Sequence, residues 1–149
     1  MHEFLEYTLD KFTFRVAADR YYNSDGVWAK EDNGRVSIGL SDFLQQRSGD
    51  IAFADVVVAG KRLSFGEEVA TIETIKVDIG LPSPVGGTVV ETNPLMEIEP
   101  EVINRDPYGG GWLAIIEASD WAADQAQLLS PQAYFEHMRT EAEEEARDQ

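Results

Sequence analysis

The chain has 149 residues, and its 28 acidic and 12 basic side chains give a formal net charge of −16 at neutral pH. It contains no cysteine, which excludes disulfide scaffolds, thiolate zinc sites and cysteine catalysis from the protein's own atoms. An acidic surface repels nucleic-acid phosphates and anionic lipid heads, and no run of about 18 apolar residues is present. We therefore expect neither nucleic acid nor a membrane as a partner. The acidic N-terminus lacks a signal-peptide pattern, which predicts a cytoplasmic protein.

The first half of the chain shows short apolar–polar alternations separated by turn-forming residues, a pattern typical of antiparallel strands. Asn-Ser-Asp-Gly at 23–26 and Asp-Asn-Gly at 32–34 are its clearest turn signals. Ser41 can cap a helix because its hydroxyl can accept a hydrogen bond from a backbone N–H of the first turn. We expect strands over residues 11–16, 27–29, 36–39 and 51–58, and a short helix over 42–46.

The second half continues with β-rich runs and then changes to a helix-forming composition. Ser130-Pro131 is typical of a helix start, with an N-cap followed by proline at the first helical position. Tyr134, Phe135 and Met138 would dock this helix, whereas the glutamate-rich tail after residue 140 is expected to be solvated or frayed. The expected elements are strands over 67–76, 88–92 and 112–116, a bend at 82–87, a helical turn over 100–104, and helices over 119–129 and from 131 onward.

These elements predict a mainly β protein, a small β-sandwich or flattened barrel with C-terminal helices added to it. We divide the chain into an N-terminal strand or extension over residues 1–20, a β domain over 21–118, and C-terminal helices with an acidic tail over 119–149.

Candidate catalytic and metal-binding groups are sparse. His2 and His137 have no second histidine or carboxylate at ligand spacing, so we expect both to be solvent-exposed. No Gly-x-Ser-x-Gly motif is present, and the glycine cluster at 109–111 lacks the context of a phosphate-binding loop. Spacing therefore identifies no catalytic residue and no metal site.

One lysine is distinguished by its position. Lys76 lies between Ile75 and Val77, near the end of a β-rich run that Gly80 interrupts soon afterwards. A hairpin turning there would present the amine at an exposed tip, where a modifying enzyme could attach a cofactor. Alternatively, the aliphatic stem of a strand lysine covers its apolar neighbours. Composition and spacing leave both interpretations open.

Three stretches of the sequence resemble the glycine-cleavage H-protein family, over roughly residues 25–135. The Asn-x-Asp-Pro-Tyr part of the second stretch is the most specific of these motifs. The stretches are Glu-Thr-Ile-Lys at 73–76 with Ser-Pro-Val-Gly-Gly-Thr-Val-Val-Glu-Thr-Asn at 83–93, Pro-Glu-Val-Ile-Asn-Arg-Asp-Pro-Tyr-Gly-Gly-Gly-Trp at 100–112, and Val-Ser-Ile-Gly-Leu-Ser-Asp at 36–42 with Gly-Asp-Ile at 49–51.

The resemblance implies a carrier protein without catalytic residues of its own. Lys76 matches the lysine that carries lipoic acid in amide linkage, as N6-lipoyllysine. Glu73 matches the acidic residue that a lipoate-protein ligase or lipoyl transferase is expected to recognise. The implied fold is the lipoyl/biotinyl hammerhead, with two small antiparallel sheets over residues 21–118 and short C-terminal helices.

The resemblance also implies partners. In the glycine-cleavage cycle the lipoyl arm accepts an aminomethyl group from glycine decarboxylase, a pyridoxal-phosphate enzyme. The arm presents that group to a folate-dependent aminomethyltransferase. Dihydrolipoamide dehydrogenase, a flavoenzyme, then reoxidises the dithiol of the arm.

Departures from the family pattern leave alternatives open. The family usually has His-Glu-Trp near its first hairpin, and this chain keeps the tryptophan as Trp28 but lacks the histidine. After the lysine the family usually has Ala-Ala-Ser-Asp, and this chain has Val-Asp-Ile-Gly at 77–80. The chain is similarly close to a branch of H-like lipoate-binding proteins that serves bacterial sulfur oxidation, where a heterodisulfide-reductase-like complex would be the partner. A biotin carrier and an unmodified binding module are further alternatives.

Overall fold

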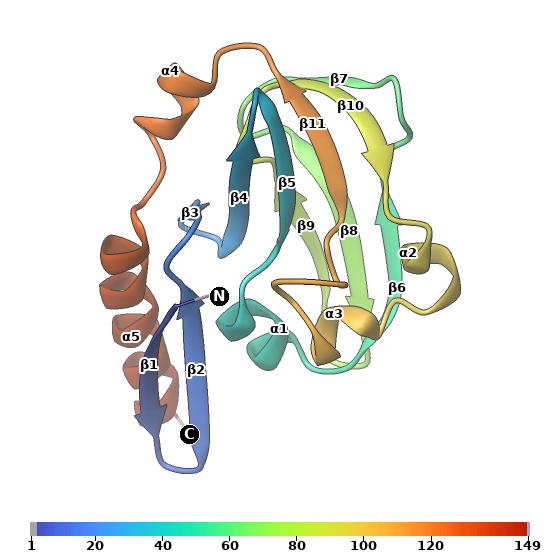
Figure 1. Cartoon of the computed structure of the whole chain (residues 1–149). Helices are drawn as coiled ribbons and strands as arrows, with labels where there is room; N and C mark the ends of the chain where they lie inside the picture. Colours follow the sequence, from blue (N-terminus) through green and yellow to red (C-terminus); the bar gives the residue numbers. More distant parts are fainter. Residues whose placement is uncertain (1–2, 149) are drawn as a thin grey trace.

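The computed structural model describes residues 3–148, so His2 lies outside the described residues (Figure 1). Within this range the strands form three antiparallel sheets. The first sheet is a hairpin of β1 (Phe4–Leu9) and β2 (Phe12–Ala17). The largest sheet has, in order across it, β3 (Tyr21–Tyr22), β4 (Val27–Asp32), β5 (Arg35–Leu40), β11 (Ala114–Ala118), β10 (Gly87–Thr92) and β7 (Arg62–Leu63). The third sheet has β6 (Ile51–Val56), β8 (Glu68–Thr74) and β9 (Asp78–Pro82).

The two larger sheets pack face to face and enclose the main core (Figure 1). In β10 and β11 buried residues alternate with more exposed ones, so that one face of the strand lies against the core. The fully or almost fully buried core side chains include Ile38 and Ile116 from one sheet and Ile72 and Leu81 from the other. Three short helices close this sandwich: α1 (Asp42–Ser48), α2 (Leu95–Ile98) and α3 (Val102–Arg105).

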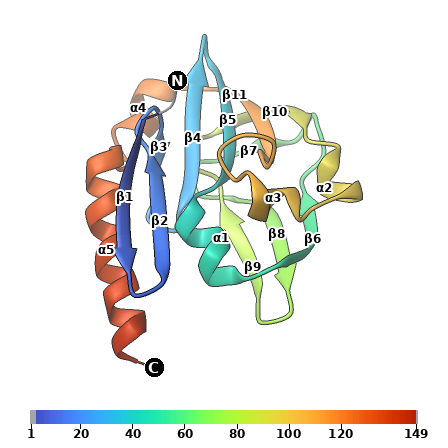
Figure 2. The ribbon, with the colours of Figure 1, turned by 60° about the horizontal axis from the view of Figure 1, so that its bottom comes forward.

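A second core joins the N-terminal hairpin to the C-terminal helix. The β1–β2 hairpin lies between α1 and the long helix α5 (Pro131–Arg147), which follows the short helix α4 (Trp121–Gln125) (Figure 2). Phe14 from the hairpin, Phe43 from α1 and Met138 from α5 are buried together there. The two ends of the chain are thus packed against each other beside the sandwich.

The two helix N-caps predicted from the sequence are present in the structure. The Ser41 hydroxyl accepts a hydrogen bond from the Leu44 N–H at 3.2 Å and begins α1. The Ser130 hydroxyl accepts one from the Ala133 N–H at 3.1 Å, with Pro131 at the first helical position of α5. Both helix starts are confirmed because a cap depends on neighbouring residues only.

Four elements differ from the expectation. The strand predicted over 11–16 is present as β2, but its partner β1 was not expected. β9, Asp78–Pro82, was not expected either and lies mostly before the predicted bend over 82–87. The helix expected over 119–129 is only α4, Trp121–Gln125. The tail, expected to be solvated or frayed, is exposed at Glu143 and Glu144 but is not frayed, since α5 continues to Arg147 and Ala142 is 5% exposed. Arg47 of α1 binds Glu141 at 3.2 Å and Glu145 at 3.6 Å, and these ion pairs fix the tail to the body.

Buried tyrosines make the fold sensitive to alkali. Burial raises the pKa of Tyr108 to about 12 and raises the pKa values of Tyr22 and Tyr134 above their ordinary value of 10.0. The Tyr22 and Tyr134 rings stack with their centres 4.4 Å apart, and the Tyr134 hydroxyl lies 2.8 Å from that of Ser41. Ionisation in the folded state would leave these phenolates without water.

We therefore expect the free energy of unfolding to fall between pH 10 and pH 12. Above pH 10 the unfolded chain releases tyrosine protons that the folded chain retains, so the stability present below pH 10 is lost as the pH rises. Tyrosinate absorbance and circular dichroism, followed in one alkaline titration, should change together. Complete tyrosine ionisation with unchanged circular dichroism would contradict this expectation.

Candidate functional site

The turn between β8 and β9 projects from one end of the sandwich and carries Lys76 (Figure 2). Thr74, the last residue of β8, holds this turn closed. Its backbone N–H donates to the Val77 carbonyl at 2.9 Å, and its hydroxyl accepts from the N–H groups of Lys76 (3.2 Å) and Val77 (3.0 Å). Serine and threonine hydroxyls commonly stabilise turns by accepting hydrogen bonds from nearby backbone N–H groups in this way.

Lys76 is exposed at this turn, outside both hydrophobic cores. Its two neighbours are exposed as well, Ile75 at 96% and Val77 at 42%. The stem of Lys76 bends back over Gly49, which follows α1: its Cε lies 3.0 Å from the point where a Cβ on that glycine would stand. The amine is thus open to another enzyme, as covalent attachment of a cofactor to this lysine requires.

Glu73 is exposed on β8, three residues before the lysine. The strand register places it opposite Asp78 on β9 and opposite Phe53 on β6. Phe53 is 66% exposed. The surface around the turn therefore combines carboxylates with uncovered apolar side chains.

The connection between α1 and β6, which lies beneath the lysine stem, is fixed by one asparagine. The Asn104 side chain accepts from the Ile51 N–H at 2.9 Å and donates to the carbonyl of Gly49 at 3.0 Å and to the side chain of Gln45 at 2.9 Å. Sequence reasoning assigned no role to Asn104, although it is the asparagine of the Asn-x-Asp-Pro-Tyr motif. Its bonds join segments more than fifty residues apart, and spacing does not reveal such contacts.

The rest of this motif is structural. Asp106 accepts from the Gly110 N–H at 2.8 Å, and the Asn93 amide donates to the Gly110 carbonyl at 2.9 Å. The indole N–H of Trp28 donates to the Pro107 carbonyl at 3.0 Å. The loop at 109–111 is therefore held by hydrogen bonds from its backbone to the side chains of Asn93 and Asp106.

His137, which was expected to be solvent-exposed, is partly exposed and also contacts two other residues. Its Nε2 lies 3.0 Å from the Ser24 carbonyl oxygen and 2.8 Å from a Glu141 carboxylate oxygen. The side chain is 38% exposed and connects α5 to the β3–β4 turn. Among residues 3–148 no group of three or more histidine and carboxylate side chains could hold a metal ion, and no helix there is long and apolar enough to span a membrane.

Comparisons with known proteins agree with this geometry. The sequence model of the family described as glycine cleavage H-protein matches residues 20–141. Glycine cleavage system H protein 4 of Aquifex aeolicus is 37% identical over 136 residues, which are 91% of this chain and 79% of that protein. The H protein of Salinibacter ruber is 40% identical over 119 residues, which are 79% of this chain and 94% of that protein.

A solved structure shows the same fold. The crystal structure of a glycine cleavage system H protein from Mycobacterium marinum superposes with a TM-score of 0.72 at 28% identity, covering 78% of this chain and 94% of that one. The predicted hammerhead fold, the family and the carrier role are confirmed. The chain belongs to the glycine cleavage H-protein family, whose members are non-catalytic carriers of lipoate attached to a lysine.

Proposed function

We propose that Lys76 is the residue that carries the lipoyl group and that the chain shuttles intermediates between the enzymes of glycine cleavage. The position of Lys76 at an exposed turn within the matched region supports this proposal. The chain has three other lysines. Lys30 pairs with Asp19 at 3.2 Å on β4, and Lys61 pairs with Glu67 at 3.5 Å. Lys11 lies at a hairpin turn too, but outside residues 20–141.

The protein's part in this function is to present the arm. Lipoate attached there would supply a cyclic disulfide, whose ring strain makes it open readily to thiols and carbon nucleophiles. The turn that Thr74 closes keeps the attachment point clear of the sandwich, so that the side chain can enter another protein's active site. Tethering raises the effective concentration of the carried group at each enzyme that the carrier meets.

The surface near the arm supports recognition by other proteins. We propose that the loading ligase or transferase reads the Glu73 carboxylate beside the exposed Ile75. The net charge of −16 would steer encounters with basic faces of glycine decarboxylase, aminomethyltransferase and dihydrolipoamide dehydrogenase. The names of the relatives favour these partners over a heterodisulfide-reductase-like complex.

Intact mass measurement tests the attachment. The full chain, produced together with a lipoate-protein ligase and lipoate, should gain the mass of one lipoyl group, and fragmentation should locate it on Lys76. A biotinyl mass, an unmodified chain, or modification of Lys11 would each overturn the assignment.

An exchange assay tests the glycine-cleavage role separately. Lipoylated protein should support glycine-dependent exchange of bicarbonate by a pyridoxal-phosphate glycine decarboxylase, and the unloaded chain should not. No exchange with the lipoyl group present would reject the glycine partners while leaving the carrier role intact.

A further inference from the structure

The tip of the N-terminal hairpin lies toward the same end of the molecule as the lysine turn (Figure 2). Asp10 and Phe12 of the tip line a groove of about 220 Å³, and Lys76 is another of its lining residues. The last turn of α5 borders the same groove with Glu145 and Ala146. The hairpin tip and the attachment site are therefore neighbours, although they are more than sixty residues apart in the sequence.

The hairpin lies outside the part of the chain that matches the family. The match covers residues 20–141, whereas the hairpin spans residues 4–17. An element added beside the lysine changes the surface that an approaching enzyme meets. It is therefore a feature by which an enzyme can distinguish this chain from carriers without it.

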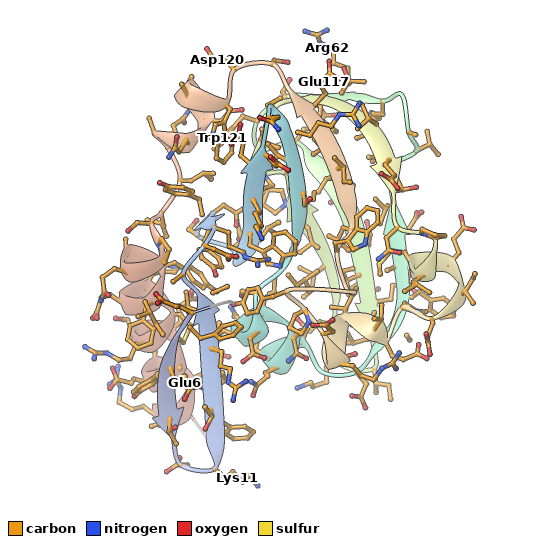
Figure 3. The ribbon with its side chains drawn as sticks, viewed as in Figure 1. Glu6, Lys11, Arg62, Glu117, Asp120 and Trp121 are labelled. Carbon is orange, nitrogen blue, oxygen red and sulfur yellow. The ribbon has the colours of Figure 1, made fainter. Side chains whose placement is uncertain are left out.

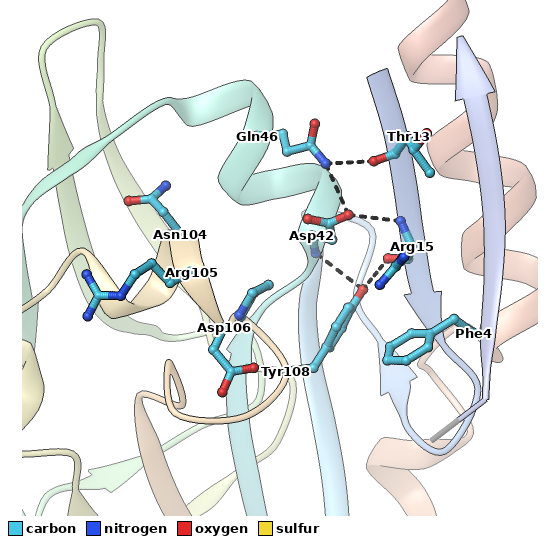
Figure 4. Close-up of a pocket in the computed structure, with 10 residues that line it drawn as sticks. Phe4, Thr13, Arg15, Asp42, Gln46, Asn104, Arg105, Asp106 and Tyr108 are labelled. Atoms are coloured by element: carbon cyan, nitrogen blue, oxygen red, sulfur yellow. Dashed lines mark hydrogen bonds between the residues drawn. The ribbon is translucent and has the colours of Figure 1, made fainter. Parts of the chain in front are cut away.

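The hairpin is held in place by hydrogen bonds to α1 and to the Asn-x-Asp-Pro-Tyr loop (Figure 4). The Arg15 N–H donates to Asp42 at 2.9 Å, and the Tyr108 hydroxyl donates to the Arg15 carbonyl at 2.7 Å. The Gln46 amide donates to the Thr13 carbonyl at 2.9 Å. Because these bonds fix the hairpin against the body, a protein that contacts its tip loses little affinity to ordering of the chain.

The exposed surface at this end suits contact with another protein. Phe12 is 50% exposed at the tip, and Ile75 and Val77 are 96% and 42% exposed at the turn. Two exposed acidic residues accompany them, Asp10 in the hairpin turn and Glu73 near the end of β8. Aromatic side chains are enriched at the centres of protein interfaces, whereas charged groups belong to the rim. A partner that fits presents an apolar recess to Phe12 and basic side chains to the carboxylates.

We propose that the hairpin tip, with Phe12 as its main contact, is a recognition site for the enzyme that loads lipoate onto Lys76. The inference rests on Lys76 as the attachment site. In loading, the Nζ amine attacks the carbonyl carbon of an activated lipoyl donor, an amide bond forms, and the leaving group of the donor and one proton depart.

The geometry of this reaction selects the loading enzyme among the partners. Its active site must come within bonding distance of the Lys76 Nζ atom, so its surface has to enclose the turn and meets the hairpin tip beside it. Enzymes that act on the sulfur ring reach a group at the far end of the arm and can stay farther from the tip. The loading enzyme is thus the partner for which contact with Phe12 is hardest to avoid.

Loading kinetics of the full unloaded chain test the proposal. With the host cell's own loading enzyme, Phe12→Ser should raise the KM for the carrier about fivefold and leave kcat unchanged, because the contact is remote from the reacting amine. The control is Phe65→Ser, which removes another exposed phenylalanine, in the loop after β7, and should leave both constants unchanged. That loop lies at the end of the molecule marked by Arg62, opposite the hairpin tip marked by Lys11 (Figure 3).

Amide hydrogen exchange locates the contact without a variant. The unloaded wild-type chain, mixed with the loading enzyme in the absence of lipoate, should exchange more slowly at residues 9–13 and 73–78 and at an unchanged rate at residues 60–66. Unchanged exchange at residues 9–13, or protection confined to the lysine turn, would overturn the proposal.

Equal KM values for the wild-type chain and Phe12→Ser would also overturn it. If circular dichroism shows that Phe12→Ser does not fold, the hydrogen-exchange result on the wild-type chain decides alone. A wild-type chain that gains no lipoyl group on Lys76 would overturn the attachment site and this inference together. Intact mass therefore distinguishes failure of the attachment from failure of the hairpin contact.

Discussion

Lys76→Arg is expected to abolish lipoylation completely while leaving the fold unchanged. A guanidinium group keeps the positive charge but stays protonated, so it cannot form the amide. The side chain is exposed and outside both cores, so the free energy of unfolding should change by less than about 0.5 kcal/mol. Intact mass and thermal unfolding measure the two effects.

Lys11→Arg is the matched control, because it changes the other lysine at a hairpin turn and should be modified as fully as the wild-type chain. Unfolding of Lys76→Arg would contradict the exposed position of the side chain. A lipoyl group still present on that variant would place the attachment elsewhere.

Gly87→Ala is expected to cause the largest loss of stability, about 4 kcal/mol. Gly87 begins β10 with φ +154°, a conformation that residues with a Cβ avoid, and an added Cβ would overlap the Glu117 carbonyl on β11. Backbone strain and steric overlap each cost about 1–3 kcal/mol. Relief would require β10 and β11 to separate where Gly87 pairs with Ala118, the first residue of β10 and the last residue of β11. Urea unfolding followed by circular dichroism measures the change.

Gly60→Ala separates the two contributions. Gly60 also has a positive φ, +97°, but no atom lies within 4 Å of an added Cβ. Only the cost of the unfavourable backbone conformation remains, so the loss of stability in Gly60→Ala should be about 1 kcal/mol. Equal losses in the two variants would show that steric overlap with Glu117 has no effect.

The parts of the fold that depend on neighbouring residues could be predicted from the sequence. The caps at Ser41 and Ser130 and the turns at 23–26 and 32–34 act over four residues or fewer. β1 had a usable signal, since Leu5, Tyr7 and Leu9 alternate and lie partly buried on one face. β9 was not predicted, because its pairing with β8 has no local sequence signal.

The C-terminal tail and the surroundings of Lys76 show more clearly what could not be predicted from the sequence. Glu141 and Glu145 suggest a solvated helix end in the sequence, but Arg47, almost a hundred residues earlier, binds both of them. The family motif identified Lys76 and Glu73 as candidates. The surface beside Lys76 combines residues of the N-terminal hairpin and of α5, so only the folded structure reveals it.

The position of α5 matters for the way this protein is handled in the laboratory. Glu145 and Ala146 of α5 line a groove together with Lys76 and with Leu9 and Phe12 of the N-terminal hairpin, so an affinity tag attached directly after α5 would begin beside this groove. Phe4 pairs with Ala17 at the opposite end of the hairpin from Leu9 and Phe12, about 17 Å away at the usual rise of a strand. A tag on the N-terminal side leaves the arm and its surroundings unobstructed.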